Sequence, residues 1–328
     1  MLSLLGCLFG FLPTQLHYTV LDLRIEPVER VYLNDRGTAA GMMREGGMPV
    51  PFLYQKGKLQ PIASQVLQVH GLNRIDELAI VGIGGPGIWR RGKTHLLDGK
   101  TRDGFPLANG GLPIGIDDMG NVLLVSHGVE GAFSAWTWPQ KSDSKQWPMP
   151  TAIAGDGAIV GIKSRGRTPP PSTGPIAFLV KGAFRTPIGG PDELAIPSCV
   201  SRSHYVGGTF TTPPENFRRP FRWFGGKFEA LPVPPECKMT VLEAINDRGD
   251  AVGLATWVGR PHEGAVVGHR GACLWSGAVW QELQHLLPDG AEYELLEAKA
   301  INSSGQILVI AAPKAKPFPR TLLLLTPG

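Results

Sequence analysis

The sequence is poor in charge and shows no helical patterning. Charged residues account for only 18% of the chain, and the formal net charge is a modest +4. No segment keeps a sustained 3.6-residue apolar repeat, which excludes a solenoid of helices. The 43 glycines and 30 prolines instead suit many short strands joined by turns.

Cysteine is also scarce, and its spacing excludes two common uses. Cys7, Cys199, Cys237 and Cys273 are far apart and form no CxxC pair, so the sequence supports neither a zinc motif nor a redox motif. Cys199 stands in a column of small residues and Cys273 in an aromatic strand, and both positions favour buried thiols. A disulfide among Cys199, Cys237 and Cys273 stays open as a second interpretation.

The sequence contains no recognisable catalytic or cofactor motif. There is no GxSxG, phosphate-binding loop or dinucleotide fingerprint, and the glycine-rich stretch 82–87 is expected to be a short loop between strands, with no helix after it. His262, Glu263 and His269 lack the spacing of a helical HExxH metal site. We therefore expect no metal, no cofactor and a protein that binds rather than catalyses.

One stretch, AINDRGDAVG at residues 244–253, is the plainest copy of a unit that recurs along the chain. Ala244 and Ile245 end a short strand, and the next four residues, NDRG, have the chemistry of a turn. An Asn or Asp at the turn entry can bond its own backbone two residues on, while glycine supplies the positive φ of a tight hairpin. The unit therefore predicts a β-hairpin.

Six other segments share the pattern, each with an aliphatic residue just before the turn and, except beside Tyr32, a small residue before that. The six are Tyr32-Leu33-Asn34, Gly71-Leu72-Asn73, Gly115-Ile116-Asp117, Ala152-Ile153-Ala154, Cys199-Val200-Ser201 and Ala300-Ile301-Asn302. A column of aliphatic residues beside a column of small ones is what stacked sheets need where they crowd together.

Each hairpin is followed by a variable loop, an apolar and aromatic strand, a glycine-containing turn and a further strand. Four short strands in a unit of roughly 40 residues, repeated seven times, predict a seven-bladed β-propeller with four-stranded blades. We expect residues 16–328 to form this propeller as a single domain. Trp89, Trp223 and Trp275 occupy matching third-strand positions, where we expect them to pack between blades.

The two ends of the chain predict a closed ring. The last unit lacks a fourth strand after residues 321–325, whereas residues 17–23 form a spare strand before the first hairpin. We expect these two segments to pair, because a closed ring covers strand edges that would otherwise invite aggregation.

The units resemble the HAF repeats, a family of bacterial, mostly extracellular repeats built on an INxxGxVVG-like hairpin followed by an aromatic strand. The resemblance is carried by AINDRGDAVG and by ACLWSGAVWQEL after it, and it covers nearly the whole chain from about Leu16 onward. In the second and fifth units, Asp76-Glu77 and Ser203-His204 replace the turn glycine. The resemblance implies a propeller-like secreted or surface protein and transfers no catalytic residue.

Residues 1–15 form an apolar segment without Lys or Arg. The segment lacks the basic start and the small-residue cleavage site of a secretory signal, so a remnant of an export signal and an apolar terminus packed on the ring both stay open. It is too short to span a bilayer. Together with the resemblance, it favours a secreted or envelope protein over the alternative, a cytoplasmic one.

The loops that join second to third strands give the chain a functional asymmetry, since those of the fourth to seventh units are long, proline-rich and basic. The predicted binding residues are Arg165, Arg167, Arg218, Arg219, Arg260, Arg270, Lys314, Lys316 and Arg320. Four such neighbouring loops would concentrate positive potential over half of one face and attract an anionic glycan or protein surface. The simpler interpretation is that the charges only solvate the loops, and nucleic acid is disfavoured because stacking aromatics are few.

Two functions are compatible with this pattern. The first is a non-catalytic binding or scaffolding propeller, which we expect to be monomeric. The second is a carbohydrate-active hydrolase or lyase, which would need ionisable residues converging at the channel mouth. The residues expected to line the channel are Val31, His70, Ile114, Thr151, Ser198, Glu243 and Lys299. Few of these are ionisable and their signs are mixed, which favours binding.

Overall fold

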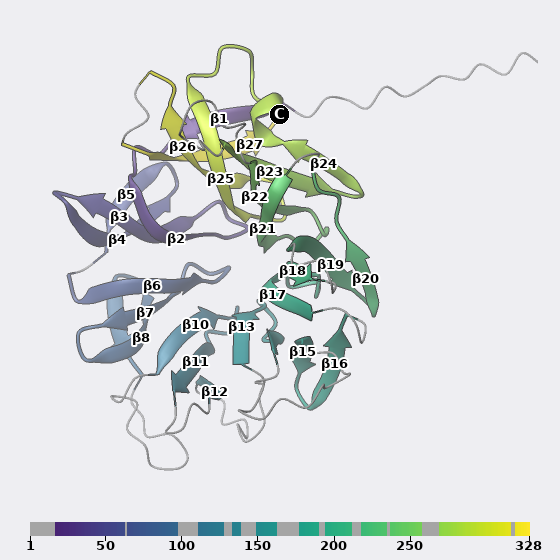
Figure 1. Ribbon diagram of the computed structural model, residues 1–328. Helices are drawn as coiled ribbons and strands as arrows, with labels where there is room; N and C mark the ends of the chain where they lie inside the picture. The colour runs from purple at the N-terminus through teal and green to yellow at the C-terminus, as the bar shows by residue number, and fades with distance from the viewer. Residues whose placement is uncertain are drawn as a thin grey trace, which may run out of the picture.

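Seven antiparallel sheets are arranged in a ring around a central axis in the computed structural model, which confirms the predicted seven-bladed β-propeller (Figure 1). The structure describes residues 17–62, 64–97, 111–127, 133–138, 149–162, 177–189, 194–211, 218–234, 237–257, 269–315 and 319–328. No helix in these ranges is long and apolar enough to cross a membrane.

Each blade begins with the hairpin that the repeated unit predicts. The innermost strands are β2 (Pro27–Leu33), β6 (Val66–Leu72), β10 (Leu112–Ile116), β13 (Met149–Ile153), β17 (Leu194–Val200), β21 (Cys237–Ile245) and β25 (Tyr293–Ile301). The second strands are β3 (Ala39–Glu45), β7 (Leu78–Gly82), β11 (Val122–His127), β14 (Ile159–Ile162), β18 (Val206–Thr211), β22 (Ala251–Trp257) and β26 (Ile307–Pro313).

Two outer strands complete most blades. The third strands are β4 (Met48–Gln55), β8 (Gly85–Arg90), β12 (Phe133–Trp138), β15 (Ala177–Lys181), β19 (Arg219–Phe224), β23 (His269–Ser276) and β27 (Thr321–Pro327). The fourth strands are β5 (Lys58–Pro61), β9 (Lys93–Leu96), β16 (Phe184–Ile188), β20 (Lys227–Ala230), β24 (Val279–Glu282) and, from the other end of the chain, β1 (Tyr18–Asp22).

Six blades have four strands, and the described residues of the third blade form three. A short 3-10 helix, η3 (Leu283–Leu286), follows the sixth blade. The glycine-rich stretch differs from the expected loop, because the turn between β7 and β8 contains only Ile83 and Gly84, and the glycines after it belong to β8.

The ring is closed by the first strand, as predicted. β1 pairs antiparallel with β27, from Tyr18 opposite Pro327 to Asp22 opposite Leu323, and in Figure 1 its purple arrow lies in the yellow seventh blade. Asp22 adds a side-chain latch at the end of β1. It accepts hydrogen bonds from the hydroxyls of Thr321, at 2.6 Å, and Tyr293, at 2.9 Å.

The apolar cores lie between neighbouring blades. Leu324 of the seventh blade shares a cluster with Phe52 of the first, and the predicted inter-blade tryptophans Trp89, Trp223 and Trp275 are all buried. Burying each large apolar side chain stabilises the fold by roughly 1.5–3 kcal/mol. Because every blade is covered on both sides, the ring needs no single central core.

The column of small residues has the predicted cause, which is close approach of adjacent inner strands. A Cβ added to Gly71 would stand 3.0 Å from the Gly115 Cα of the next blade. A Cβ added to Gly115 would in turn stand 2.7 Å from Ile153 Cγ2. Both distances are shorter than ordinary carbon contacts, so larger side chains would push the blades apart.

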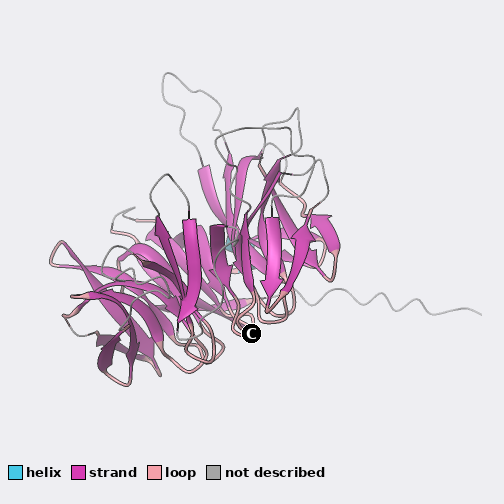
Figure 2. Cartoon of the chain, turned by 90° about the horizontal axis from the view of Figure 1, so that it is seen from below, coloured by secondary structure: helices cyan, strands magenta, loops and turns pink. Residues whose placement is uncertain are grey.

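Strand direction gives the ring two different faces, and Figure 2 views it edge-on. We call turn face the side that carries the hairpin turns after the innermost strands, from residues 34–38 in the first blade to residues 302–306 in the seventh. We call loop face the opposite side, where second strands connect to third strands and each blade connects to the next.

Candidate functional site

Asparagine residues at four of the seven turn entries join neighbouring blades on the turn face. Asn246 Oδ1 accepts hydrogen bonds from the backbone N–H of Arg248 at 3.0 Å and of Asp250 at 2.9 Å, as an Asx turn requires. Its Nδ2 donates to the Asn302 carbonyl of the next blade at 3.2 Å. One side chain therefore fixes its own turn and joins two blades.

The same arrangement recurs in the seventh, first and second blades. Asn302 donates to the carbonyl of Asn34 at 3.1 Å, Asn34 to that of Asn73 at 2.9 Å, and Asn73 to that of Asp117 at 3.0 Å. These side chains are buried and their bonding groups are occupied. The turn signature found in the sequence is therefore structural.

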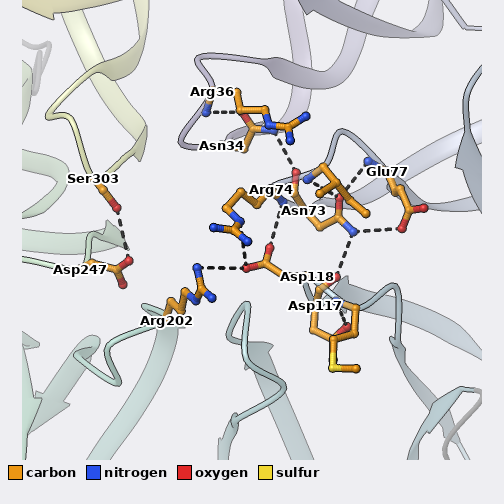
Figure 3. Close-up of polar contacts among 12 residues, drawn as sticks. Asn34, Arg36, Asn73, Arg74, Glu77, Asp117, Asp118, Arg202, Asp247 and Ser303 are labelled. Atoms are coloured by element: carbon orange, nitrogen blue, oxygen red, sulfur yellow. Dashed lines mark hydrogen bonds and ion pairs between the residues drawn. The ribbon is translucent and has the colours of Figure 1, made fainter.

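The mouth of the channel on the turn face is a cavity of about 200 Å³ to which all seven blades contribute. Asp118 lies there between two arginines, 3.8 Å from both Arg74 and Arg202, and accepts a hydrogen bond from the Arg74 backbone at 3.0 Å (Figure 3). Asp247 likewise accepts hydrogen bonds from Ser203 at 2.8 Å and from Ser303 at 3.3 Å. The charges at this mouth largely compensate one another.

A β-bulge lies two residues before the end of most innermost strands. In each of blades two to seven the pairing register skips the residue two positions before the end of the innermost strand, and these skipped residues are His70, Ile114, Thr151, Ser198, Glu243 and Lys299. A bulge leaves the extra residue unpaired and redirects its side chain. The positions predicted to line the channel in these six blades are thus the bulge positions.

The prediction for the first blade is wrong. Val31 pairs directly with Gly41, because the register shift of this blade lies earlier, between Pro27 and Val31. Val31 is consequently buried against the seventh blade. Arg30 and Tyr32 line the channel in its place.

The larger opening lies at the loop-face end of the channel. This loop-face cavity has a volume of about 610 Å³ and is formed by the first, second, third and seventh blades. Its apolar walls include Val28, Val69, Ile114 and Ile310. Its polar lining residues are Arg30, Tyr32, His70, Glu297, Lys299 and Arg320. A volume of this size is typical of small-molecule and peptide sites.

Lys299 is locked in a network of charges inside this cavity. Its Nζ lies 3.1 Å from Glu243 Oε1 and 2.9 Å from Glu297 Oε2. Burial alone would lower the pKa of Lys299, but the two glutamates outweigh it and raise that pKa above its ordinary value. Glu297 also accepts a hydrogen bond from exposed Arg270 at 3.3 Å.

Arg30 is a positively charged residue of the cavity whose side chain can bind a ligand. Its side chain is exposed at the rim, and it makes no hydrogen bond or ion pair with any part of the chain that the structure describes. Arginine offers a planar set of donors that matches carboxylates, sulfates and phosphates. An anionic group entering the cavity would therefore meet Arg30 as a free partner.

The predicted binding residues lie on the loop face wherever the structure describes them. Arg320 lines the cavity, Arg270 is paired with Glu297, and Arg218, Arg219 and Lys314 are exposed beside the strands β19 and β26. Arg165, Arg167, Arg260 and Lys316 lie outside the described residues. Arg30 was missed, because the sequence carries no sign of the shifted register in the first blade.

Cys273 is buried as predicted, and so is Cys237, whereas Cys199 is only half-buried. Cys199, Cys237 and Cys273 are free thiols, and burial raises the pKa of both Cys199 and Cys273 to about 12. Thiolates, the reactive form, are therefore disfavoured at these two positions. A disulfide among these three cysteines, which the sequence left open, is not formed.

A metal site finds no support in the described parts of the chain. No group of three His, Cys, Asp or Glu side chains there is placed to hold an ion. His262 and Glu263, and the side chain of His269, lie outside what the structure describes.

Solved propellers resemble this fold. The β-propeller domain of the Trilobed protease from Pyrococcus furiosus matches with a TM-score of 0.54 at 8% identity, over 92% of this chain and 97% of that one. TolB from Acinetobacter baumannii matches with a TM-score of 0.35 at 12% identity, over 89% of this chain and 63% of that one. Acylaminoacyl peptidase from Pyrococcus horikoshii matches with a TM-score of 0.42 at 12% identity, over 92% of this chain and 44% of that one.

The first of these likenesses shows the propeller fold and, at 8% identity, nothing about activity. The Pyrococcus furiosus domain has an open velcro topology, whereas β1 and β27 pair in this chain. The sequence matches no protein-family model and no curated protein.

Proposed function

We propose that this protein is a non-catalytic binding or scaffolding propeller whose loop face holds an anionic glycan or an acidic protein surface. The observation that carries the proposal is the loop-face cavity, where Arg30 has no partner among the described residues and Arg320 stands at the same opening. Exposed Arg218 and Lys314 extend the basic character along this face. Clustered cations on one face steer anions towards it.

The hydrolase or lyase alternative has weaker support in this cavity. Glycoside hydrolysis generally uses two carboxyl groups that flank the scissile bond. Among the described lining residues Glu297 is the single carboxylate, and it is occupied by Lys299 and Arg270. Because this one carboxylate is already engaged and no second one lines the described cavity, we favour binding.

We also propose that the chain is a relative of the HAF repeats that acts as a monomer outside the cell or in its envelope. The support is the AINDRGDAVG signature, which forms the hairpin and inter-blade bonds of the turn face. Fractionation of the producing cells tests the location. Recovery of the protein only from the cytoplasm would refute an envelope role.

The binding proposal is tested by retention on immobilised heparin over a salt gradient. We expect the double variant Arg30→Glu, Arg320→Glu to bind heparin roughly tenfold or more weakly, a loss of about 1.4 kcal/mol of binding free energy. The double variant Arg218→Glu, Arg219→Glu shows how far the site extends along the loop face. Lys58→Glu with Lys227→Glu is the matched control, because it makes the same charge change at exposed turn-face positions.

Unfolding midpoints show that each variant is folded before retention is compared. If the turn-face control loses as much heparin binding, the effect comes from net charge and not from the loop-face cavity. Unchanged retention of the Arg30 and Arg320 variant would remove the cavity from the binding site.

A further inference from the structure

A second cavity, of about 390 Å³, lies between the sixth and seventh blades on the turn face. Its floor is apolar and buried, formed by Leu274 and Ile301. Its polar lining residues are Tyr18, Arg248, Asp250, Ser276 and Ser304. Tyr18 belongs to β1, so this cavity exists only in the closed ring.

At two other blade junctions the corresponding space is closed by a long side chain from the end of the third strand. Gln55 donates a hydrogen bond to Asp76 of the next blade at 2.8 Å, and Lys181 lies 3.4 Å from His204 of the next blade. In the sixth blade this position is Ser276, whose short side chain bonds Asp250 of its own blade at 2.8 Å.

The next blade contributes no filling side chain either. Gly305 stands at the turn, with a φ of 84° that favours glycine. The guanidinium of Arg248 lies over this glycine, with Nη2 2.9 Å from where a Cβ would stand. This junction therefore combines two small residues, whereas the first and the fourth junctions each have at least one large side chain.

Two hydrogen-bonding groups face this cavity without a partner. The Tyr18 side chain is buried, yet its hydroxyl makes no hydrogen bond with any described residue. Arg248 donates through Nε to Asp250 at 3.1 Å, and its two terminal nitrogens have no partner among the same residues. Burial raises the pKa of Tyr18, Asp250 adds to this effect and Arg248 opposes it, so the hydroxyl stays protonated and can donate.

The neighbouring serines supply acceptors rather than donors. Ser276 donates its proton to Asp250, and Ser304 donates its proton to Asn302 at 2.8 Å. Their oxygens can therefore accept hydrogen bonds from a ligand. Donors on one side and acceptors on the other fit a carboxylate that carries neighbouring hydroxyl groups.

We propose that this inter-blade cavity binds a small hydroxycarboxylate of monosaccharide size, such as a sugar acid. Arg248 and the Tyr18 hydroxyl hold the carboxylate, Ser276 and Ser304 accept from the hydroxyl groups, and Leu274 with Ile301 contacts the carbon skeleton. Because Tyr18 lies in the closing strand, the bound ligand also stabilises the closed ring.

The test is a calorimetric titration of the full chain with D-glucuronate, with D-glucose as the neutral analogue of the same shape. We expect glucuronate to bind at least tenfold more tightly than glucose and to raise the unfolding midpoint. Ser276→Gln places in the cavity the residue that closes the first junction, and should abolish binding while the ring stays folded. Tyr18→Phe removes only the hydroxyl and should weaken binding about tenfold.

The Lys58→Glu, Lys227→Glu variant is the matched control, because both residues are exposed and lie outside the two proposed sites, and it should bind glucuronate as the unaltered protein does. Conversely, Ser276→Gln should be retained on heparin unchanged, which separates this cavity from the proposed function of the loop face. No glucuronate binding at millimolar concentration, equal binding of glucose, or undiminished binding by folded Ser276→Gln would each overturn the proposal.

Discussion

The turn entries on one face of the ring and the loop-face cavity on the other are built from the same strands but use their polar groups in opposite ways. On the turn face, the entry residues such as Asn246 and Asn302 satisfy their own turns and bond the next blade. On the loop face, Arg30 stands at a cavity of about 610 Å³ without a partner in the described chain. The repeated turn residues build the scaffold, and the positions that differ from the repeat leave openings that a ligand can enter.

The largest expected effect comes from opening the ring. Deletion of residues 1–24 removes β1 and leaves the β27 edge unpaired beside buried residues such as Leu323 and Leu325. We expect the loss of several kcal/mol of stability and association through the exposed edge. Thermal unfolding and sedimentation measure both, and a truncated chain that stays monomeric and equally stable would refute the closure.

The comparison of the faces is tested by one substitution on each. Asn246→Ala removes two turn hydrogen bonds and one inter-blade bond from a buried site, which should cost about 2–4 kcal/mol of unfolding free energy. Arg30→Ala, exposed on the loop face, should change it by less than about 0.5 kcal/mol. Chemical denaturation measures the free energy of unfolding of both variants. Equal losses of this free energy would contradict the different roles of Asn246 in the scaffold and Arg30 in binding.

A smaller effect is expected at the latch in acid. Burial would raise the pKa of Asp22, but hydrogen bonds from Thr321, the Arg24 backbone and Tyr293 outweigh it and lower that pKa below its ordinary value. Because the pKa of Asp22 is lower in the folded protein than in the unfolded chain, its ionised form stabilises the fold. This contribution to the free energy of unfolding is fully present at pH values above the unfolded-state pKa of about 3.9, and it is lost as the pH falls through the pKa of Asp22 in the folded protein.

Unfolding midpoints measured between neutral pH and strongly acid pH test this linkage. Asp22→Asn should lower the midpoint at neutral pH and flatten its decline in acid, while Thr321→Val should produce part of the same change. A decline in Asp22→Asn as steep as in the unaltered protein would show that the latch does not titrate as described.

The blade count and ring closure could be predicted because their signals are local or lie at the ends of the chain. Turn residues such as Asn246 and Gly249 determine hairpins within a few positions. The shifted register of the first blade could not be predicted, since it depends on how the residues between Pro27 and Val31 pair with β3. For the same reason Arg30 went unnoticed.

The second and fifth turns show a similar limit. Asp76 and His204 adopt φ values of 67°, where glycine is usual. Asp76 accepts hydrogen bonds from Asn34 and Gln55 of the first blade, both at 2.8 Å, and His204 lies 2.7 Å from Asp156 of the fourth. These contacts between blades compensate for the backbone strain, and a search for turn glycines cannot reveal them.

Hydrogen–deuterium exchange with and without a heparin oligosaccharide tests the central claim most directly, because it reports both faces in one experiment. We expect slower exchange in peptides that cover residues 27–32 and 69–70 at the loop-face cavity, and unchanged exchange in the turns at residues 34–38 and 73–77. Protection confined to those turns, or no protection on either face, would contradict the account.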